Sequence, residues 1–417
     1  MPATKTKPKE SEAASVALTP PCLEFIISTT ALKAVFTSAN RAVPAKPDRP
    51  ILATVLIEAI KDKREGVQLT GFDLNFGLHY FEPAIVSHPG SVAVPGKLLA
   101  DILSKITDDF QLQVAVRRQE SGALVMTCTT LTGEFTLNCM DGTAYPALPD
   151  IDEDPNGLEE VQPTAGLLAR AMKATLDNAS NEATKKVLCG LHLSTPEPGF
   201  LEMCATDGHR LTTYKFEVQG AEISPVTIPE RACRELMRVL EGLPAEESIL
   251  LQVAEGHLIR VKIGDRLQVV SRIISDPYPD YRRLIPAQFS TTVTCDRKVL
   301  RAVLERAEVY SQHRSLVAAM EISLTNNEIT LTVAAPDCGN FRESLPAQTT
   351  TTDPNIQRDG AIRIGFNTQY LIRTLKMFDG EEVSTSINTK TGPVIWRPLT
   401  GQSHLCMVMP VDLGKST

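Results

Sequence analysis

The sequence lacks long hydrophobic runs and a recognisable export signal. No apolar stretch in its 417 residues approaches the roughly 20 residues that a membrane-spanning helix needs, so we expect no part of it to span a bilayer. The first 22 residues contain Lys5, Lys7 and Lys9 but no apolar segment typical of a secretory signal. We therefore interpret residues 1–22 as a disordered N-terminal tail.

The sequence also lacks the spacings that bind metals or form a disulfide framework. Its nine cysteines include no CxxC pair, and its seven histidines include no HxxxH or HExxH pair. These absences argue against a zinc site and metal catalysis, so we expect no metal and no other cofactor. An odd number of scattered cysteines is typical of small buried residues in a reducing compartment, which predicts a cytoplasmic protein.

What the sequence does contain is a threefold repeat with a period of about 130 residues. Each copy opens with a strand and an amphipathic helix, and a short strand and a second helix follow further on. Two landmarks recur in order: a leucine in the first helix at Leu32, Leu168 and Leu300, and an aspartate in a strand-like segment at Asp73, Asp207 and Asp337. Each copy is large enough to enclose its own core.

The periodicities within each copy predict an α+β fold. Apolar residues recur every three or four positions in the helices and alternate in the strands, which indicates helices laid on one face of an antiparallel sheet. We predict six helices, at Thr29–Arg41, Pro95–Thr107, Thr164–Ser180, Pro229–Leu240, Asp296–Tyr310 and Thr368–Phe378. The three domains are expected at residues 23–150, 151–287 and 288–417. The polar segment Thr349–Gly360 is expected to be a solvent-exposed loop.

Charge is distributed unevenly between the predicted helices and the rest of the chain. The formal net charge is −8, from 42 Lys and Arg against 50 Asp and Glu. The six helices hold 15 basic and 7 acidic residues, which leaves 27 basic and 43 acidic residues elsewhere. If the helices share one surface, that surface would attract a polyanion. The alternative is that these residues form ordinary solvated helix faces.

Three short strings identify a family resemblance. They are Ala-Thr-Asp-Gly-His-Arg-Leu at 205–211, Tyr-Pro-Asp-Tyr-Arg-Arg-Leu-Ile-Pro at 278–286 and Val-Met-Pro-Val-Asp-Leu at 408–413. Together with the threefold repeat, they resemble the bacterial DNA polymerase III beta subunit family, the sliding clamps. The resemblance runs from about Leu23 to Leu413.

The resemblance implies a non-catalytic processivity factor. Members of this family form head-to-tail homodimers closed into a ring, with the helices lining a central hole and the sheets outside. The ring would encircle duplex DNA through its phosphates without reading sequence, and would tether the replicative DNA polymerase and other clients. An ATP-driven clamp loader would open it.

The resemblance also assigns residues to three surfaces. It implies a client-peptide pocket at Lys185, Leu188, Thr206, Gly208, His209, Arg210, Leu211, Pro279, Arg283, Leu284, Asn367, Tyr370, Met407, Met409 and Pro410. It implies DNA-facing residues at Lys33, Lys46, Lys97, Lys105, Arg170, Lys173, Lys185, Lys186, Arg234, Arg238, Arg301, Arg373 and Lys376. It implies a dimer interface at Phe135, Leu137, Val309 and Tyr310.

Departures from the family pattern concern the rim of the pocket. Lys185 stands where relatives often carry arginine, which keeps the charge and loses bidentate geometry. Asp412 replaces a frequently basic residue, so client affinities are expected to differ. Lys186 and Val187 replace aromatic residues found in some relatives, so stacking on a template strand is not expected.

Two other functions remain as alternatives. Asp207, His209 and Arg210 could form part of a hydrolase site, with His209 as base and Asp207 orienting it. However, the sequence shows no partnered nucleophile and no glycine-rich phosphate loop. The second alternative is a clamp-like scaffold that binds protein partners without encircling DNA. For Met409 and for the four interface residues Phe135, Leu137, Val309 and Tyr310, a place in an ordinary core is a further possibility.

Overall fold

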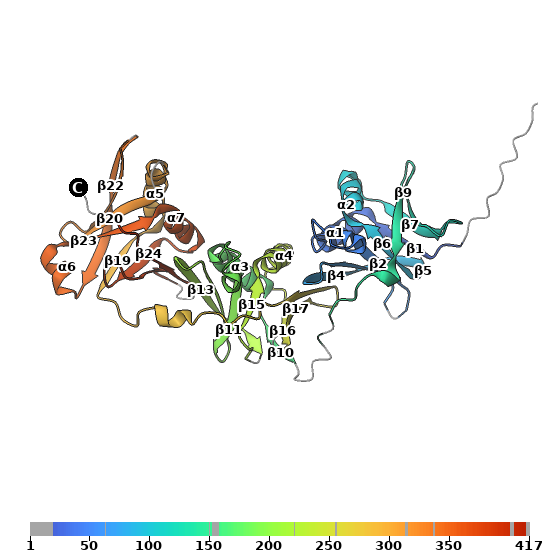
Figure 1. The fold of residues 1–417 in the computed structure, drawn as a ribbon, viewed down its shortest axis with the longest axis horizontal. Coiled ribbons are helices and arrows are strands. Elements are labelled where there is room, and N and C mark those ends of the chain that lie inside the picture. The colour runs from blue at the N-terminus through green and yellow to red at the C-terminus, as the bar shows by residue number, and fades with distance from the viewer. Residues whose placement is uncertain are drawn as a thin grey trace, which may run out of the picture. The chain divides into compact units, whose positions relative to one another are not determined.

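The computed structural model describes residues 20–413, except 63, 150, 152–157, 221, 255–256, 313–315, 337 and 401–403. Most of the predicted N-terminal tail therefore lies outside the described residues. The chain divides into two compact units, Met1–Ala147 and Leu148–Thr417. The first unit contains the first sequence copy, and the second unit contains the other two (Figure 1). In the part of the chain that is described, no helix is long and apolar enough to cross a membrane.

The first unit is one antiparallel sheet covered by two helices. Its elements are β1 Leu23–Ser28, α1 Thr29–Asn40, β2 Thr54–Ile60, β3 Gly66–Phe72, β4 Phe76–Pro83, β5 Ile85–His88, β6 Gly90–Pro95, α2 Gly96–Lys105, β7 Gln111–Arg118, β8 Leu124–Thr129 and β9 Glu134–Asp141. The strand order is β4-β3-β2-β6-β9-β8-β7-β1-β5. α1 begins at Ser28, whose hydroxyl accepts a hydrogen bond from the Ala31 amide, and it buries Leu32 and Phe36 against the sheet.

The second unit carries the two remaining copies. The second copy consists of β10 Leu158–Gln162, α3 Ala165–Thr175, β11 Gly190–Glu197, β12 Phe200–Thr206, β13 Arg210–Glu217, β14 Gln219–Gly220, β15 Val226–Pro229, α4 Glu230–Glu241, β16 Leu250–Ala254, β17 Leu258–Ile263 and β18 Leu267–Arg272. The third copy consists of β19 Thr291–Asp296, α5 Arg297–Ser311, β20 Val317–Ser323, β21 Glu328–Ala335, β22 Gly339–Thr351, α6 Pro354–Asp359, β23 Ala361–Asn367, α7 Thr368–Met377, β24 Glu382–Ile387, β25 Val394–Pro398 and β26 His404–Val408.

Each copy contains the same five-element motif twice. A strand leads into a helix and three antiparallel strands follow, as in β1-α1-β2-β3-β4 and again in β6-α2-β7-β8-β9. The two helices of each copy pack against each other, α1 with α2, α3 with α4 and α5 with α7. The six predicted helices in three tandem α+β copies are therefore all present, and the short α6 is a seventh that was not predicted. The limits of the six differ from the predicted ones by a few residues at most, apart from the third, which ends in a short 3₁₀ turn, Leu176–Asn178.

The repeated aspartates have a structural role at the hairpin between the second and third strands. Asp73 Oδ1 accepts backbone hydrogen bonds from Asn75 and Phe76, at 2.9 and 2.6 Å. Asp207 Oδ1 accepts the equivalent bonds from His209 and Arg210, at 2.9 and 3.0 Å. A short acceptor side chain stabilises such a turn because it replaces a backbone carbonyl. Asp337 lies outside the described residues.

The prediction of a loop at Thr349–Gly360 was wrong. Thr349–Thr351 complete β22, and Pro354–Asp359 form the short helix α6. The Asp353 carboxylate accepts hydrogen bonds from the Asn355 and Ile356 amides, while Gly360 ends the helix with φ +74. Ile356 is buried in the core of the third copy. An N-terminal cap, a proline in the first turn and a C-terminal glycine are helix signals that outweighed the polar composition.

Candidate functional site

The second and third copies are joined edge to edge through β13 and β26. These strands pair antiparallel, with Arg210 opposite Val408 and Leu211 opposite Met407. The β12–β13 turn and the end of β26 therefore lie side by side, and the Met409 amide donates a 2.9 Å hydrogen bond to the His209 carbonyl. We call the surface formed by residues 206–210, 367–370 and 409–410 the junction slot. It brings together residues about 200 positions apart in sequence.

The β12–β13 turn has a backbone that its own side chains hold in place. The Thr206 hydroxyl donates to the Arg210 carbonyl at 2.7 Å and accepts from the Gly208 amide at 3.1 Å. Gly208 has φ +94, a left-handed conformation that favours glycine. A Cβ at this position would approach the Lys185 ammonium to 4.0 Å, so Lys185 lies beside the turn. Lys185 forms an ion pair with Glu182 at 3.0 Å.

Arg210 connects the turn to the third copy. Its side chain is only 5% exposed, and its Nε donates to Asp207 Oδ2 at 3.0 Å. Its Nη2 donates to the carbonyl of Asp177, at 2.7 Å. The guanidinium also lies 4.7 Å from the centre of the Tyr370 ring, on α7. Asn367 caps α7 by accepting hydrogen bonds from the Gln369 and Tyr370 amides. Its side-chain oxygen is therefore already used within the chain.

Two of the predicted pocket residues are buried beneath the surface of the slot. Leu211 and Met407 are 0% and 5% exposed, and they share a buried cluster with Cys204, Tyr281 and Ile395. Met409 and Pro410 are partly exposed at the end of β26. The surface of the slot is thus formed by Thr206–Arg210, Tyr370, Met409 and Pro410, with the cluster as its base.

The segment that links the second and third copies packs against the same cluster. Tyr281 is buried, and Ile285 packs on the cluster from its edge. The predicted pocket residues of this segment are exposed instead, with Arg283 85% and Leu284 55% exposed. Pro279 is exposed as well, and Arg283 forms a 2.7 Å ion pair with Asp280. Leu188, in the turn Lys186–Leu188, is partly buried, and its carbonyl accepts from the Ser180 amide.

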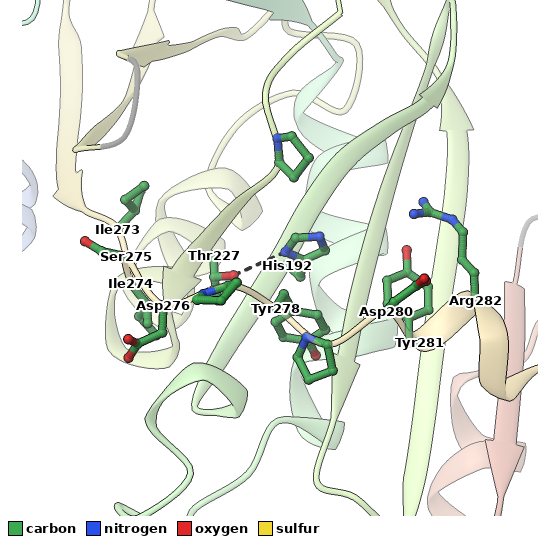
Figure 2. A pocket seen from close by; sticks show the side chains of 13 residues that line it. His192, Thr227, Ile273, Ile274, Ser275, Asp276, Tyr278, Asp280, Tyr281 and Arg282 are labelled. Carbon is green, nitrogen blue, oxygen red and sulfur yellow. Dashed lines mark hydrogen bonds between the residues drawn. The ribbon is translucent and has the colours of Figure 1, made fainter.

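A cavity of ≈420 Å³ borders this linking segment (Figure 2). Most of its wall is formed by residues 273–282, with His192 from β11 and Thr227 from β15. Pro279 is the only residue of the predicted pocket among those that line it. Sequence reasoning did not single out His192, because an isolated histidine in a strand carries no distinguishing signal.

The geometry of Asp207 and His209 does not support a hydrolase. One Asp207 oxygen accepts two backbone hydrogen bonds and the other pairs with Arg210, so the carboxylate does not orient the His209 ring. Among the residues described, no three His, Cys, Asp or Glu side chains are grouped as metal ligands. The nine cysteines are all free, and five of them are buried.

The predicted DNA-facing cations fall into three groups. Seven are exposed and have no ion pair in the described part of the chain: Lys46, Lys97, Lys105, Arg170, Lys173, Lys186 and Arg373. Five others form ion pairs: Lys185 with Glu182, Arg234 with Glu230 and Asp177, Arg238 with Glu235, and Arg301 and Lys376 with Glu305. Lys33 donates to the carbonyls of Ser104 and Ile106 and so caps the end of α2. Counting the basic residues of the helices does not separate the exposed cations with no ion pair from those that form ion pairs.

The four predicted interface residues also differ in exposure. Val309 is 61% exposed on α5, and Tyr310 packs on Phe341 with ring centres 5.6 Å apart. Phe135 is partly exposed on β9, whereas Leu137 is 3% exposed and belongs to the core of the first unit. The alternation of inward and outward residues along β9 explains why Thr136 and Asn138, on the opposite face of the strand, are exposed.

Comparison with known proteins agrees with this architecture. Three family models match the chain in order: the N-terminal domain of the DNA polymerase III beta subunit over residues 23–149, the central domain over 164–280 and the C-terminal domain over 282–412. The beta sliding clamp of Synechococcus elongatus is 31% identical over 94% of this chain and 100% of that protein. The beta sliding clamp of a Synechocystis species is 32% identical over the same shares.

The fold is shared with a solved structure. The crystal structure of the DNA polymerase sliding clamp from Bacillus subtilis superposes with a TM-score of 0.83, covering 94% of this chain and 99% of that one at 24% identity. A triplicated domain in which paired helices lie on an antiparallel sheet defines the class of sliding clamps. The chain belongs to the DNA polymerase III beta subunit family.

Proposed function

We propose that this chain is a DNA polymerase processivity factor with no catalytic activity of its own. Two copies would associate head to tail into a ring around duplex DNA, and the ring would tether the replicative polymerase and other clients. The observation that carries this proposal is the presence of three tandem copies of one domain, because two such chains supply the six copies of a closed ring. The domain limits 23–150, 151–287 and 288–417 and a cytoplasmic location belong to the same proposal.

The free strand edges support the proposed dimer. In the described part of the chain, residues 134–138 of β9 pair only with β8, and residues 339–346 of β22 pair only with β21. An unpaired strand edge is a template for another chain. Phe135 lies on the first edge, and Val309 and Tyr310 lie on the helix that packs behind β22. Pairing these edges head to tail would cover the exposed Val309.

The unpaired cations support the proposed contact with DNA. Lys97, Lys105, Arg170, Lys173 and Arg373 lie on α2, α3 and α7 and are exposed. Phosphate contacts from such side chains carry no sequence information, as a protein that slides along DNA requires. The ion-paired residues Arg234 and Arg238 would contribute less, because a bound carboxylate already neutralises each of them.

The junction slot supports the proposed client pocket. Partly exposed Met409, Pro410 and Tyr370 offer apolar contact, and the exposed His209 offers hydrogen bonds. A short linear motif from a polymerase or a clamp loader would bind by placing its hydrophobic residues there. An ATP-driven clamp loader would use the same slot when it opens the ring.

The proposal is tested by retention on circular DNA. Protein loaded onto a primed circle should remain bound through gel filtration and should leave when the circle is cut. Protein that is lost equally from circular and linear DNA would exclude encirclement and favour the scaffold without DNA. The client pocket is tested separately by deleting Met409–Thr417, which should abolish binding of polymerase-derived peptide while the dimer persists.

A further inference from the structure

The cavity that borders the linking segment has apolar and aromatic side chains in its wall and is open on one side. Its volume of ≈420 Å³ lies within the range of small ligand pockets. Figure 2 shows Ile273 and Ile274 on one side of the cavity and Tyr281 on the other. Ser275 and Pro277, which also line it, are exposed to solvent. A short segment of another chain can therefore enter without disturbing the wall.

One buried polar side chain in the wall has a hydrogen-bonding position without a partner. His192 on β11 is 8% exposed, and its ring stacks on Tyr278 with centres 4.4 Å apart. Its Nδ1 lies 3.2 Å from the Thr227 hydroxyl. Its Nε2 has no protein partner in the described part of the chain, and solvent can reach this atom. Because His192 lines the cavity, Nε2 is open to an occupant.

The hydrogen bonds around the His192 ring indicate which nitrogen carries its hydrogen. Burial, with a smaller contribution from Arg282, lowers the pKa of His192 to about 4, so at neutral pH the ring is neutral and has one N–H. Thr227 is 3% exposed, and within the described residues Nδ1 is the only partner of its hydroxyl, so the hydroxyl donates to Nδ1. The ring hydrogen is therefore assigned to Nε2. The cavity thus offers a hydrogen-bond donor, which a carbonyl oxygen satisfies.

The charged side chains that line the cavity leave one carboxylate without a partner. Arg282 is paired with Glu202 at 2.5 Å, and Asp280 is paired with Arg283 at 2.7 Å. Asp276 is exposed and has no ion pair in the described part of the chain. An unpaired carboxylate attracts a cationic group and repels an anionic one. The edge of the cavity therefore complements a basic side chain.

We propose that this cavity binds a peptide segment of a partner protein in which an apolar residue precedes a lysine or arginine. The backbone carbonyl of the apolar residue accepts a hydrogen bond from His192 Nε2, and its side chain packs between Ile273 and Tyr278. The basic side chain that follows pairs with Asp276. This site does not require the client function proposed for the junction slot.

The test compares three small probes on the full-length protein by ligand-observed nuclear magnetic resonance titration. N-acetyl-Leu-Lys-amide should bind with a Kd of about 1 mM or lower. N-acetyl-Leu-Glu-amide should bind about tenfold more weakly, because Asp276 repels its carboxylate. Free lysinamide keeps the cation and lacks the acetyl-leucine, so it should also bind about tenfold more weakly.

Two variants locate the binding of the probes. Asp276→Lys changes an exposed side chain, so the fold should persist, and it should reverse the preference so that the glutamate probe binds more tightly than the lysine probe. His192→Phe keeps a ring to stack on Tyr278 and should weaken the lysine probe about tenfold through the lost hydrogen bond. The matched control is Glu217→Lys at the far end of β13, outside the cavity, which should retain the wild-type preference.

Three results would contradict the proposed site. Equal affinities of the wild-type protein for the three probes would show that neither the carbonyl nor the cation is recognised. A preference for lysine that survives Asp276→Lys would place the probe elsewhere on the protein. Undiminished binding of the lysine probe to His192→Phe would show that Nε2 does not hold its carbonyl.

Discussion

The guanidinium of Arg210 lies 4.7 Å from the ring of Tyr370, so a side chain of the second copy packs on a helix of the third. The same guanidinium is bonded to Asp207 and to the carbonyl of Asp177. Arg210 therefore helps to fix the position of the turn relative to α7. This arrangement has consequences for the slot that can be measured.

Replacing the Tyr370 ring should weaken the slot. Tyr370→Leu removes a cation–π contact of about 1 kcal/mol and frees the Arg210 guanidinium to move, so we expect weaker binding of polymerase-derived peptide. Tyr370→Phe keeps the ring and should bind as the wild type does. Peptide titrations of the two variants give the comparison. Equal losses in both would show that the hydroxyl, and not the ring, is what matters.

The exposed cations of α3 should contribute more to DNA binding than those of α4. Arg170→Gln with Lys173→Gln should reduce the slope of log affinity against log salt by about 1.8, since each lost phosphate contact releases about 0.9 fewer counterions. Arg234→Gln with Arg238→Gln removes the same charge but affects residues already paired with carboxylates, so a smaller change is expected. Salt titrations of both double variants on one DNA duplex measure the two slopes. Equal slopes for both double variants would contradict this assignment.

The proposed dimer interface should be sensitive to charge at Val309. Val309→Asp places an unpaired carboxylate in an apolar contact, which costs several kcal/mol, so the dimer should dissociate at least about a hundredfold more readily. Val309 is 61% exposed, so the folded monomer should remain stable. Val299→Asp is the matched control, because Val299 is 44% exposed at the other end of α5.

Sedimentation equilibrium distinguishes these outcomes. A Val309→Asp dimer that persists at low micromolar concentration would show that α5 is not part of the dimer interface. Leu137→Ala should behave differently from both valine variants. It should destabilise the first unit by about 2–5 kcal/mol through a cavity in the core, and it should not change contacts at the dimer interface directly.

Two buried histidines should make stability depend on pH. Burial lowers the pKa of His192 and of His404 to about 4. Between pH 6.5 and 4 the unfolded state binds protons that the folded state does not, so stability rises with pH across this window and falls on acidification. Each histidine contributes up to about 3 kcal/mol of this loss.

Urea unfolding at pH 7 and pH 4.5 measures the effect. His404→Gln and His192→Gln should each reduce the difference in stability between the two pH values. His209→Gln, at an exposed position, is the control and should retain the full difference. A His404→Gln protein with the wild-type pH dependence would show that folding does not shift the pKa of His404.

Local patterns account for what could be predicted. The six helices follow from apolar residues repeating every three or four positions, and their starts follow from caps such as Ser28 and Asp296. These features act over one or two turns of chain, so they are visible in sequence. The helix α6, which was not predicted, has the same kind of capping signals in Asp353, Pro354 and Gly360. Its polar composition favoured the prediction of a loop.

The sequence by itself determined the threefold repeat, the α+β class, the family and the residue types available to each surface. Only the tertiary structure decided which of those residues are exposed or buried. Cys406 contacts Thr212 across 194 positions, and such pairing depends on how β13 and β26 meet. The burial of Leu137 and Met407 and the cavity at His192 likewise arise from long-range packing, which no local period encodes.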